Sequence, residues 1–279
     1  MNGTIVIAAA PAYAECFRET ADMLVAGLAA LGHTATGCGA ARPGTLNIIL
    51  GWMNMRELGI QPAPGSIIYN QEYLSDERRP PYTDLPEQLA ELAKTCRVWD
   101  YCESNRSYML STFGVPSTFL PMCYAPGQVR IPPAPLQDID VLFYGAISDR
   151  RQHILNELTR IGLHVQSLWH VWGRQRDVII ARSKLVLNLH YWSSHPFEEV
   201  RVSHLLTNSV AVLAEVGPHT IISDDMRHAV WGVPYDQLVS AARLLIRHPG
   251  IRRALARTGH EIFAQRDIRP YLQQALMGV

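Results

Sequence analysis

The sequence lacks the cysteine and histidine spacings that metal sites and disulfide frameworks require. Its five cysteines lie at positions 16, 38, 96, 102 and 123, all in the first half of the chain, and no two of them have C-x-x-C spacing. The eleven histidines are scattered without H-x3-H spacing. We therefore expect no metal site and no disulfides, and a reducing, cytoplasmic setting for the protein.

Charge is also scarce, because only 18% of the residues are charged whereas 48% are hydrophobic. There is no run of five or six basic residues, which is the usual footprint of a nucleic-acid-binding protein. Residues 1–126 carry 8 Lys and Arg against 12 Asp and Glu, whereas the remainder carries 17 against 13. This mildly basic second half suits a small anionic ligand, and we expect no nucleic-acid partner.

Several recognisable motifs and long apolar runs are missing too. The start, MNGTIVIAAAPAYAECF, lacks the basic region of a signal peptide. No apolar run reaches the roughly 18–20 residues of a membrane span, so we expect no transmembrane segment. The chain has neither the G-x-S-x-G elbow of serine hydrolases nor the G-x-G-x-x-G fingerprint of dinucleotide-binding folds.

The chain does contain short apolar runs that alternate with helical patterns. Continuous apolar runs of this length are typical of parallel strands covered on both faces. Expected strands lie at 4–10, 46–52, 66–70, 96–101, 117–122, 138–145, 163–169, 184–190 and 209–217. Expected helices lie at 15–31, 85–94, 103–113, 149–162, 174–183, 196–208, 235–247 and 250–266. The sequence thus predicts the α/β class with doubly wound sheets.

A proline-rich stretch divides this pattern into two halves. Residues 126–137, PGQVRIPPAPLQ, contain four prolines and one glycine, which is typical of a linker. We expect one Rossmann-like domain at 1–126 and a second at 138–279. Ligands of such sheets bind beyond the carboxyl ends of the strands, so two facing sheets predict a site in the cleft between them.

Several ordered motifs resemble those of glycosyltransferases with the GT-B fold. In the second half these are DIDVLFYGAISDRRQHILNELTRIGLHV, ARSKLVLNLHYW and PFEEVRVSHLLTNSVAVLAE, and in the first half IIYNQEYL, VWDYCESN and TFLPMCYAP. The nearest group is the CgeB-like, spore-maturation-type glycosyltransferases, related to the group 1-like family. The resemblance implies metal-independent sugar transfer from a nucleotide-diphosphate sugar such as a UDP-sugar, with the nucleotide on the second domain and no bound cofactor.

The strand-to-helix turn FYGAISDRR offers candidates for the donor diphosphate. A glycine in such a turn lets backbone N–H groups approach a phosphate, and the N-terminus of a helix favours negative charge. We expect Gly145, Ser148 and Arg150 to contact the diphosphate. The alternative is that Gly145 only forms a tight turn and that Arg150 and Arg151 are solvated helix residues.

The next two strand ends carry aromatic and polar side chains. In SLWHVWG, Trp169 or Trp172 would stack on the base, within a loop that ends at Gly173. The alternative for a tryptophan is packing of a helix on the sheet. In LNLHYW, Asn188 and His190 alternate with leucines at the end of a strand and are further candidates for donor contacts.

The stretch HPFEEVRVSHLL opens a helix with an acidic first turn. Pro196 suits the first helical position, and acids there interact well with the helix dipole. We expect donor contacts from Phe197, Glu198, Arg201 and Ser203, with Glu198 on ribose or sugar hydroxyls and Arg201 on phosphate. Glu198 and Arg201 share a helix face, so an ion pair between them is the alternative.

One departure from the family pattern concerns this helix. Many GT-B enzymes carry two glutamates separated by seven residues there. In this chain Leu206 and Thr207 stand eight positions after Glu198 and Glu199.

The first half offers two candidates for a catalytic base. An inverting enzyme needs a group that takes the proton of the acceptor hydroxyl. Glu72 closes a strand in YNQEYL and is the first candidate, and Asp100 in VWDY is the second. The alternatives are a helix cap for Glu72 and a structural hydrogen bond for Asp100. The D-x-D sequence at 138–140 precedes a strand rather than following it, so we expect a role at the domain boundary.

The leading hypothesis is therefore a glycosyltransferase that acts on an acceptor hydroxyl. The acceptor is a saccharide, a lipid-linked molecule, a small molecule or a protein. The alternative is a glycosyltransferase-like subunit that binds nucleotide-sugars, or serves as a scaffold, without turnover.

Overall fold

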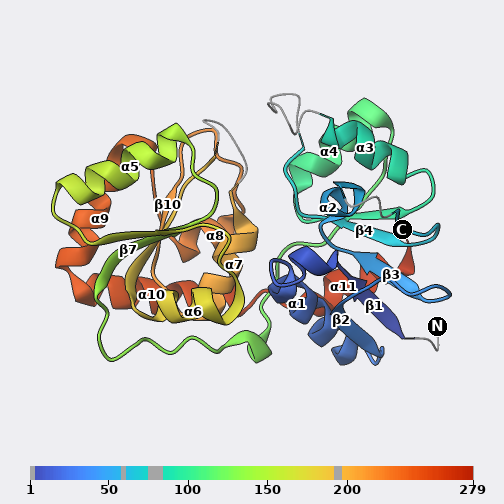
Figure 1. The fold of residues 1–279 in the computed structure, drawn as a ribbon, viewed down its shortest axis with the longest axis horizontal. Coiled ribbons are helices and arrows are strands. Elements are labelled where there is room, and N and C mark those ends of the chain that lie inside the picture. The colour runs from blue at the N-terminus through green and yellow to red at the C-terminus, as the bar shows by residue number, and fades with distance from the viewer. Residues whose placement is uncertain (1–3, 58–60, 75–83, 192–196, 279) are drawn as a thin grey trace. The chain divides into compact units, whose positions relative to one another are not determined.

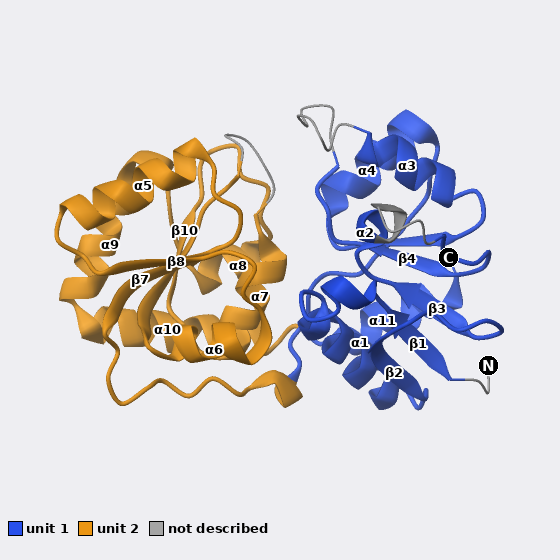
Figure 2. Cartoon of the chain, viewed as in Figure 1, with its two compact units in different colours: residues 1–125, 267–279 blue, residues 126–266 orange. Residues whose placement is uncertain are grey.

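The computed structural model describes residues 4–57, 61–74, 84–191 and 197–278, which form two compact units. Unit 1 consists of residues 1–125 and 267–279, and unit 2 of residues 126–266 (Figure 2). Each unit is a parallel sheet with helices on both faces (Figure 1). The predicted α/β class with two doubly wound sheets is confirmed.

Unit 1 contains a six-stranded sheet in the order β2-β1-β3-β4-β5-β6. Its elements are β1 (Ile5–Ala8), η1 (Pro11–Tyr13), α1 (Arg18–Ala30), β2 (Ala35–Gly39), β3 (Leu46–Ile49), α2 (Trp52–Glu57), β4 (Ile67–Asn70), α3 (Leu85–Leu92), β5 (Arg97–Asp100), α4 (Glu103–Phe113), β6 (Thr118–Phe119) and α11 (Ile268–Met277). In Figure 1, α2, α3 and α4 lie on one side of the sheet, and α1 and α11 lie on the other. All four residues of β4 are buried because both faces are covered.

Unit 2 contains a five-stranded sheet in the order β11-β10-β9-β7-β8. Its elements are η2 (Pro126–Gln128), β7 (Ile139–Tyr144), α5 (Asp149–Arg160), β8 (Val165–Leu168), α6 (Gly173–Ala181), β9 (Ser183–Asn188), α7 (Glu199–Thr207), β10 (Val212–Glu215), α8 (Asp224–Ala229), β11 (Trp231–Val233), η3 (Tyr235–Gln237), α9 (Leu238–Arg247) and α10 (Pro249–Phe263). Helices α5 and α9 pack on one face of the sheet, whereas α6, α7 and α10 cover the other (Figure 1).

The order of strands reverses at β7, which pairs with β8 on one side and with β9 on the other. The chain runs outward from β7 to β8 and then returns to start β9 on the opposite side. The two crossover helices, α5 and α6, lie on opposite faces of the sheet, so β7 and β9 flank the switch point. Open α/β sheets bind their ligands at such a switch point.

The last helix departs from the predicted domain boundary of 138–279. Residues 267–279 belong to unit 1, where α11 packs against α1. Gly27 makes this contact possible, since a Cβ atom at Gly27 would lie 2.6 Å from side-chain atoms of both Ile268 and Leu272. The linker also begins within unit 2, which starts at residue 126.

None of the helices in the described parts of the chain combines the length and the apolar character that crossing a membrane requires. The longest of these helices, α10, has 15 residues.

We predict that Leu272→Ala destabilises unit 1 and leaves unit 2 unchanged. Leu272 is fully buried, and removing a buried leucine side chain costs about 2–5 kcal/mol. Hydrogen–deuterium exchange checks this, with faster exchange expected in α1 and β1, and with exposed Gln274→Ala as the matched control. Faster exchange in α9 and α10 instead would place the last helix with unit 2.

Candidate functional site

Three charged side chains form a cluster at the switch point of unit 2. Glu198 precedes α7 and accepts a hydrogen bond from Arg151 of α5 through Oε1. Its other oxygen, Oε2, lies 2.5 Å from Nη1 of Arg201, which is in the first turn of α7. The same Arg201 nitrogen donates to Oδ1 of Asn188 at the end of β9, at 3.1 Å. The cluster therefore joins α5, α7 and β9, and contains two cations and one carboxylate.

Gly145 follows β7 and borders this cluster directly. Its φ of +135° favours glycine, and a Cβ atom at this position would lie 2.6 Å from Nη2 of Arg201. The guanidinium group also lies over the rings of Phe143 and Tyr144, at 5.5 and 5.4 Å from their centroids. A side chain at Gly145 would thus displace the Arg201 guanidinium from its observed position and would also strain the turn.

Arg151 is the most enclosed member of the cluster, with 3% of its side chain exposed. Its Nε donates to the carbonyl of Leu189 at 3.1 Å, and Nη1 donates to the carbonyl of Ala146 at 2.8 Å. Burial, together with the charge of Arg201, lowers the pKa of Arg151 to about 10, although Glu198 opposes this shift. Arg151 therefore remains charged at neutral pH and anchors the loop that follows β7.

Arg150, a predicted diphosphate ligand, is engaged elsewhere. Both of its terminal nitrogens donate to Glu215 at the end of β10, at 2.6 and 2.7 Å. The group also lies 4.2 Å from the centroid of the Tyr235 ring and donates to the carbonyl of His190 at 3.0 Å. Since both terminal nitrogens are bound to protein groups, we assign Arg150 to the connection between α5 and β10.

Four other predicted donor contacts are buried in the structure. Asn188, His190, Phe197 and Ser203 are each no more than 4% exposed. Asn188 supports Arg201, whereas Nε2 of His190 lies 3.1 Å from the carbonyl oxygen of Glu215. Burial lowers the pKa of His190, which favours the neutral ring. The Ser203 hydroxyl donates to the carbonyl of Val200 within α7, at 2.9 Å. Asn188 thus contacts the cluster directly, whereas His190, Phe197 and Ser203 are buried parts of the surrounding fold.

Of the diphosphate candidates, Ser148 comes directly before α5. It makes no side-chain cap to the helix, and its hydroxyl donates to the carbonyl of Tyr191 at 3.4 Å. Pro196, which suited the first helical position, lies outside the described residues.

An aromatic loop follows β8, beside the same edge of the sheet. The rings of Trp169 and Trp172 flank His170 edge to face, with centroids 4.4 and 5.4 Å from the His170 ring. Trp169 is 56% exposed, so its indole offers a free face. Gly173 begins α6 with a φ of +57° and is buried. The loop thus has an exposed flat surface of the kind that stacks on a nucleobase.

In unit 1 the two predicted bases belong to one hydrogen-bond network. Asp100 is 1% exposed, and its carboxyl accepts from the backbone N–H of Cys102 and from the side chains of Asn70 and Asn105, at 2.7 to 3.0 Å. Both asparagines also donate to the carbonyl of Glu72, each at 2.8 Å. Asp100 therefore has the structural role, and it fixes the loop that carries Glu72.

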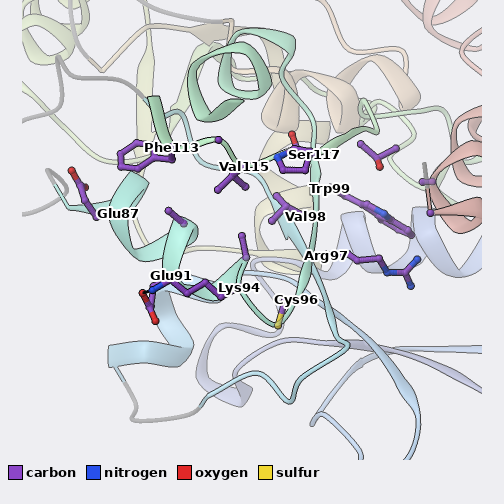
Figure 3. Close-up of a pocket in the computed structure, with 17 residues that line it drawn as sticks. Glu87, Glu91, Lys94, Cys96, Arg97, Val98, Trp99, Phe113, Val115 and Ser117 are labelled. Atoms are coloured by element: carbon purple, nitrogen blue, oxygen red, sulfur yellow. Dashed lines mark hydrogen bonds and ion pairs between the residues drawn. The ribbon is translucent and has the colours of Figure 1, made fainter. Parts of the chain in front are cut away.

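Unit 1 also contains a cavity of about 690 Å³ beside the first half of β5 (Figure 3). Phe113, Val115 and Val98 form apolar walls, while Glu87 and Glu91 of α3 lie at its border. The cavity borders β5 from Arg97 to Trp99, and neither Glu72 nor Asp100 lines it. We therefore do not include it in the candidate site.

The D-x-D sequence pairs with neighbouring cations at the start of β7. Asp138 binds Arg182, and Asp140 binds Lys184 at 2.6 Å and the backbone N–H of His164 at 2.9 Å. Both acids thus occupy the amino-terminal edge of the sheet, opposite to the candidate site. Their partners all belong to unit 2, which begins at residue 126, so Asp138 and Asp140 connect strands within unit 2 rather than lying at the domain boundary expected from the sequence.

Sequence reasoning missed Arg151 and Glu215. Arg151 had a detectable signal, since it stands on the buried stripe of α5 that continues with Ile154, Leu155 and Leu158. An arginine in such a stripe needs a partner. Glu215 had no comparable signal, because its partner Arg150 is 65 residues away in the chain.

Comparison with known proteins identifies the fold. No family model matches the chain. Uncharacterized proteins L137 and L140 of Acanthamoeba polyphaga mimivirus are 31% identical over 133 residues and 26% identical over 181 residues. These matches cover 44% and 62% of this chain, but only 18% and 56% of the viral proteins, so the chain spans a part of each.

Several solved structures match most or nearly all of the chain. Anabaena HepE in complex with UDP gives a TM-score of 0.59 at 11% identity, covering 99% of this chain and 100% of HepE. WaaG, a glycosyltransferase involved in lipopolysaccharide biosynthesis, gives 0.59 at 11%, covering 98% of both chains. TarM gives 0.58 at 9%, covering 84% of this chain and 54% of TarM. The chain therefore has the GT-B fold of these proteins.

We predict that Asp100 makes the stability of unit 1 depend on pH. Burial raises its pKa to about 7, above the ordinary value of 3.8. The stability associated with this raised pKa is present below pH 4 and is lost as pH rises through 7, by up to about 1.4 kcal/mol per pH unit. Asp100→Asn should remove this slope and add a constant loss, because the amide cannot accept all three hydrogen bonds.

The measurement is the free energy of unfolding of both proteins at intervals from pH 4 to 8. Parallel curves for wild type and variant would show that Asp100 does not titrate in this range. Glu103→Gln, at an exposed position on α4, is the control for a general change in charge.

Proposed function

We propose that the protein is a glycosyltransferase that moves a sugar from a nucleotide-diphosphate sugar to an acceptor hydroxyl. The observation that carries this proposal is the Arg151–Glu198–Arg201 cluster at the switch point of a GT-B fold. HepE has been crystallised with UDP and with UDP-glucose. Two guanidinium groups against one carboxylate leave a surplus positive charge where a diphosphate is expected to bind.

Arg201 is the proposed contact to the diphosphate. Its side chain is 14% exposed, whereas that of Arg151 is 3% exposed, so Arg201 is nearer to an entering ligand. Planar guanidinium groups match phosphate oxygens in a bidentate manner. The start of α5 adds a second source of positive potential, because Ser148 leaves the first turn without a side-chain cap.

Glu198 has a supporting role in this proposal. Each of its oxygens already accepts from one arginine, as the ion-pair alternative of the sequence analysis required. We therefore propose that Glu198 orients Arg201 instead of binding the ribose of the donor. Trp169 and Trp172 are the proposed stacking surface for the base.

The leaving group would be stabilised without a metal ion. Arg201 and the helix N-terminus would neutralise the charge that develops on the diphosphate as the sugar is transferred. Glu72 would accept the proton of the acceptor hydroxyl. Asn70 and Asn105 hold its backbone carbonyl in place. Its side chain is half-buried, so an acceptor can reach it. We also propose that the protein is a member of the CgeB-like group and that it is located in the cytoplasm.

The first test is binding of UDP and of guanosine, thymidine and cytidine diphosphates, measured by thermal shift and calorimetry in EDTA. A ligand that binds the folded protein raises its melting temperature. We predict that Arg201→Ala weakens binding of the preferred diphosphate about tenfold or more, and that Arg201→Lys has an intermediate effect. Arg243→Ala, on the exposed surface of α9, is the matched control.

Undiminished affinity in Arg201→Ala, with the fold verified by circular dichroism, would contradict the assignment. Binding of a nucleotide-sugar without transfer or hydrolysis would favour the non-catalytic subunit. Binding that requires a divalent cation would contradict the proposed independence of metals.

A second prediction concerns the chemical step. Glu72→Gln should reduce kcat about 10²- to 10⁴-fold and leave the donor KM unchanged, since the amide cannot accept a proton. Steady-state transfer kinetics provide the measurement, and Glu87→Gln on the exposed side of α3 provides the control. A kcat equal to that of the wild type would exclude Glu72 as the base.

A further inference from the structure

Helix α7 carries the proposed diphosphate contact, and both of its ends bind segments at the boundaries of unit 2. The chain enters unit 2 at residue 126 and leaves it after residue 266. Backbone N–H groups near the first point bind the residue that follows α7, and the side chain of Arg266, at the second point, binds the first residue of α7. These contacts were not anticipated from the sequence, because the partners are far apart in the chain.

At the amino-terminal end of α7, the contact is made by Arg266. Its Nη1 pairs with Glu199, the first residue of α7. Its Nε and Nη2 bind both oxygens of Asp225 on α8, at 2.8 and 2.7 Å, and Nη2 also donates to Ser223 at 2.8 Å. All three guanidinium nitrogens are thus engaged, and they tie the start of α7 to the start of α8.

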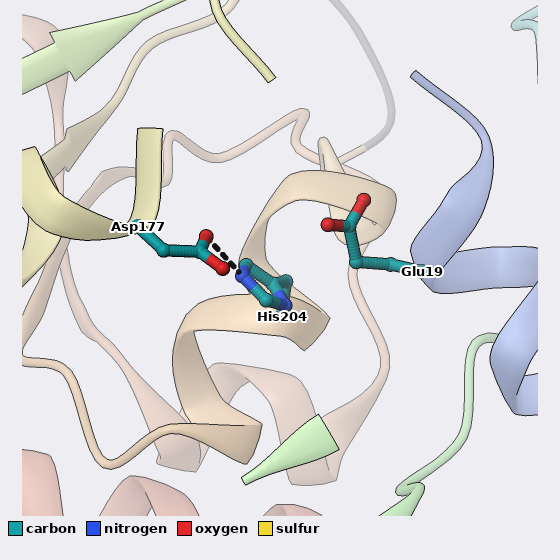
Figure 4. Close-up of side chains that lie close together, drawn as sticks. All are labelled: Glu19, Asp177 and His204. Atoms are coloured by element: carbon teal, nitrogen blue, oxygen red, sulfur yellow. Dashed lines mark hydrogen bonds and ion pairs between the residues drawn. The ribbon is translucent and has the colours of Figure 1, made fainter. Parts of the chain in front are cut away.

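At the other end of α7, the contact is made by Asn208. Its Oδ1 accepts from the backbone N–H groups of Arg130 and Ile131, at 2.7 and 2.9 Å, and its Nδ2 donates to the carbonyl of His204. Asp177 of α6 reinforces this end. Its oxygens lie 2.9 Å from Nε of Arg130 and 3.1 Å from Nε2 of His204 (Figure 4).

The two anchors differ in their distance from the candidate site. Glu199 is adjacent to Glu198 and two residues before Arg201, whereas Asn208 follows the last turn of the helix. Glu199 and Arg201 lie in the same turn of α7, which has about 3.6 residues per turn. An ion pair that holds Glu199 therefore also limits the rotation of that turn. Loss of the Arg266–Glu199 contact would leave the first turn, and with it Glu198 and Arg201, held by fewer interactions.

We propose that Arg266 is a positioning residue of the donor site, which acts through Glu199 on Arg201. This inference rests on the proposed function, because it assigns to Arg266 the orientation of the group that binds the diphosphate. Arg266 itself needs no contact with the ligand. Outer residues that orient ligand-binding side chains commonly affect affinity although they do not touch the ligand.

A double-mutant cycle on UDP affinity tests this assignment. The four proteins are wild type, Arg266→Gln, Arg201→Ala and the double variant, with the dissociation constant measured by calorimetry. Arg266→Gln alone should raise the Kd about three- to thirtyfold. In the Arg201→Ala background the same substitution should have almost no effect, since the residue on which it acts is gone.

Two further variants separate positioning from simple stabilisation. Glu199→Gln removes the same ion pair with less change in shape and should raise the Kd in parallel with Arg266→Gln. Arg266→Lys keeps the charge but not the fork of donors, so an intermediate Kd is expected. Arg257→Gln, at an exposed position on α10, is the matched control and should leave the Kd unchanged.

The outcomes are distinct. If wild type binds UDP and Arg266→Gln changes only the melting temperature, Arg266 is a structural residue and the inference fails while the proposed function stands. Equal effects of Arg266→Gln in both backgrounds would also overturn it. If Arg266→Gln does not fold, the same comparison is made with Glu199→Gln. If wild type binds no nucleoside diphosphate, the proposed function fails first, and the inference with it.

Discussion

The burial of Arg151 is the constraint on which the arrangement of unit 2 depends. A guanidinium group with 3% of its side chain exposed is costly unless it is paired and hydrogen-bonded. Two backbone carbonyls satisfy part of this requirement, and Glu198 supplies the compensating charge. Because Glu198 immediately precedes α7 and Arg151 belongs to α5, their pairing connects the starts of the two helices on either side of the switch point.

The neighbouring pair of Arg150 and Glu215 shows what distinguishes the cluster. In this pair, Arg150 donates two parallel hydrogen bonds to Glu215. The pair is therefore neutral, and both terminal nitrogens of Arg150 are bound. In the cluster, a single carboxylate is shared between Arg151 and Arg201, and an additional negative charge would be favourable. Consecutive arginines in one helix thus differ in function because one faces the end of β10 and the other faces β9.

The sequence predicted the layered fold because buried parallel strands are continuous apolar runs, as in KLVLNLH and IIYN. It missed β2 and β11, whose residues ATGCG and WGV are largely exposed or half-buried at sheet edges. It also assigned residues 267–279 to the second domain, because the contact of α11 with Gly27 joins positions more than 200 residues apart. For the site, helical spacing correctly placed Glu198 beside Arg201, whereas the carboxylate's second partner came from another helix.

Asp100 and Glu72, the two candidates for the catalytic base, belong to one hydrogen-bond network. Asp100 is enclosed and accepts hydrogen bonds from three donors, which leaves it no access to a substrate. Those donors include Asn70 and Asn105, which both bind the carbonyl of Glu72, while Oδ1 of Asn70 accepts from the N–H of Glu72 at 3.1 Å. A substitution at Asp100 would therefore alter the placement of Glu72 without removing a reacting group. A loss of activity in such a variant is expected whether Asp100 reacts or only places Glu72, so the Glu72 variant decides the assignment of the base, and the pH dependence of stability reports on Asp100 itself.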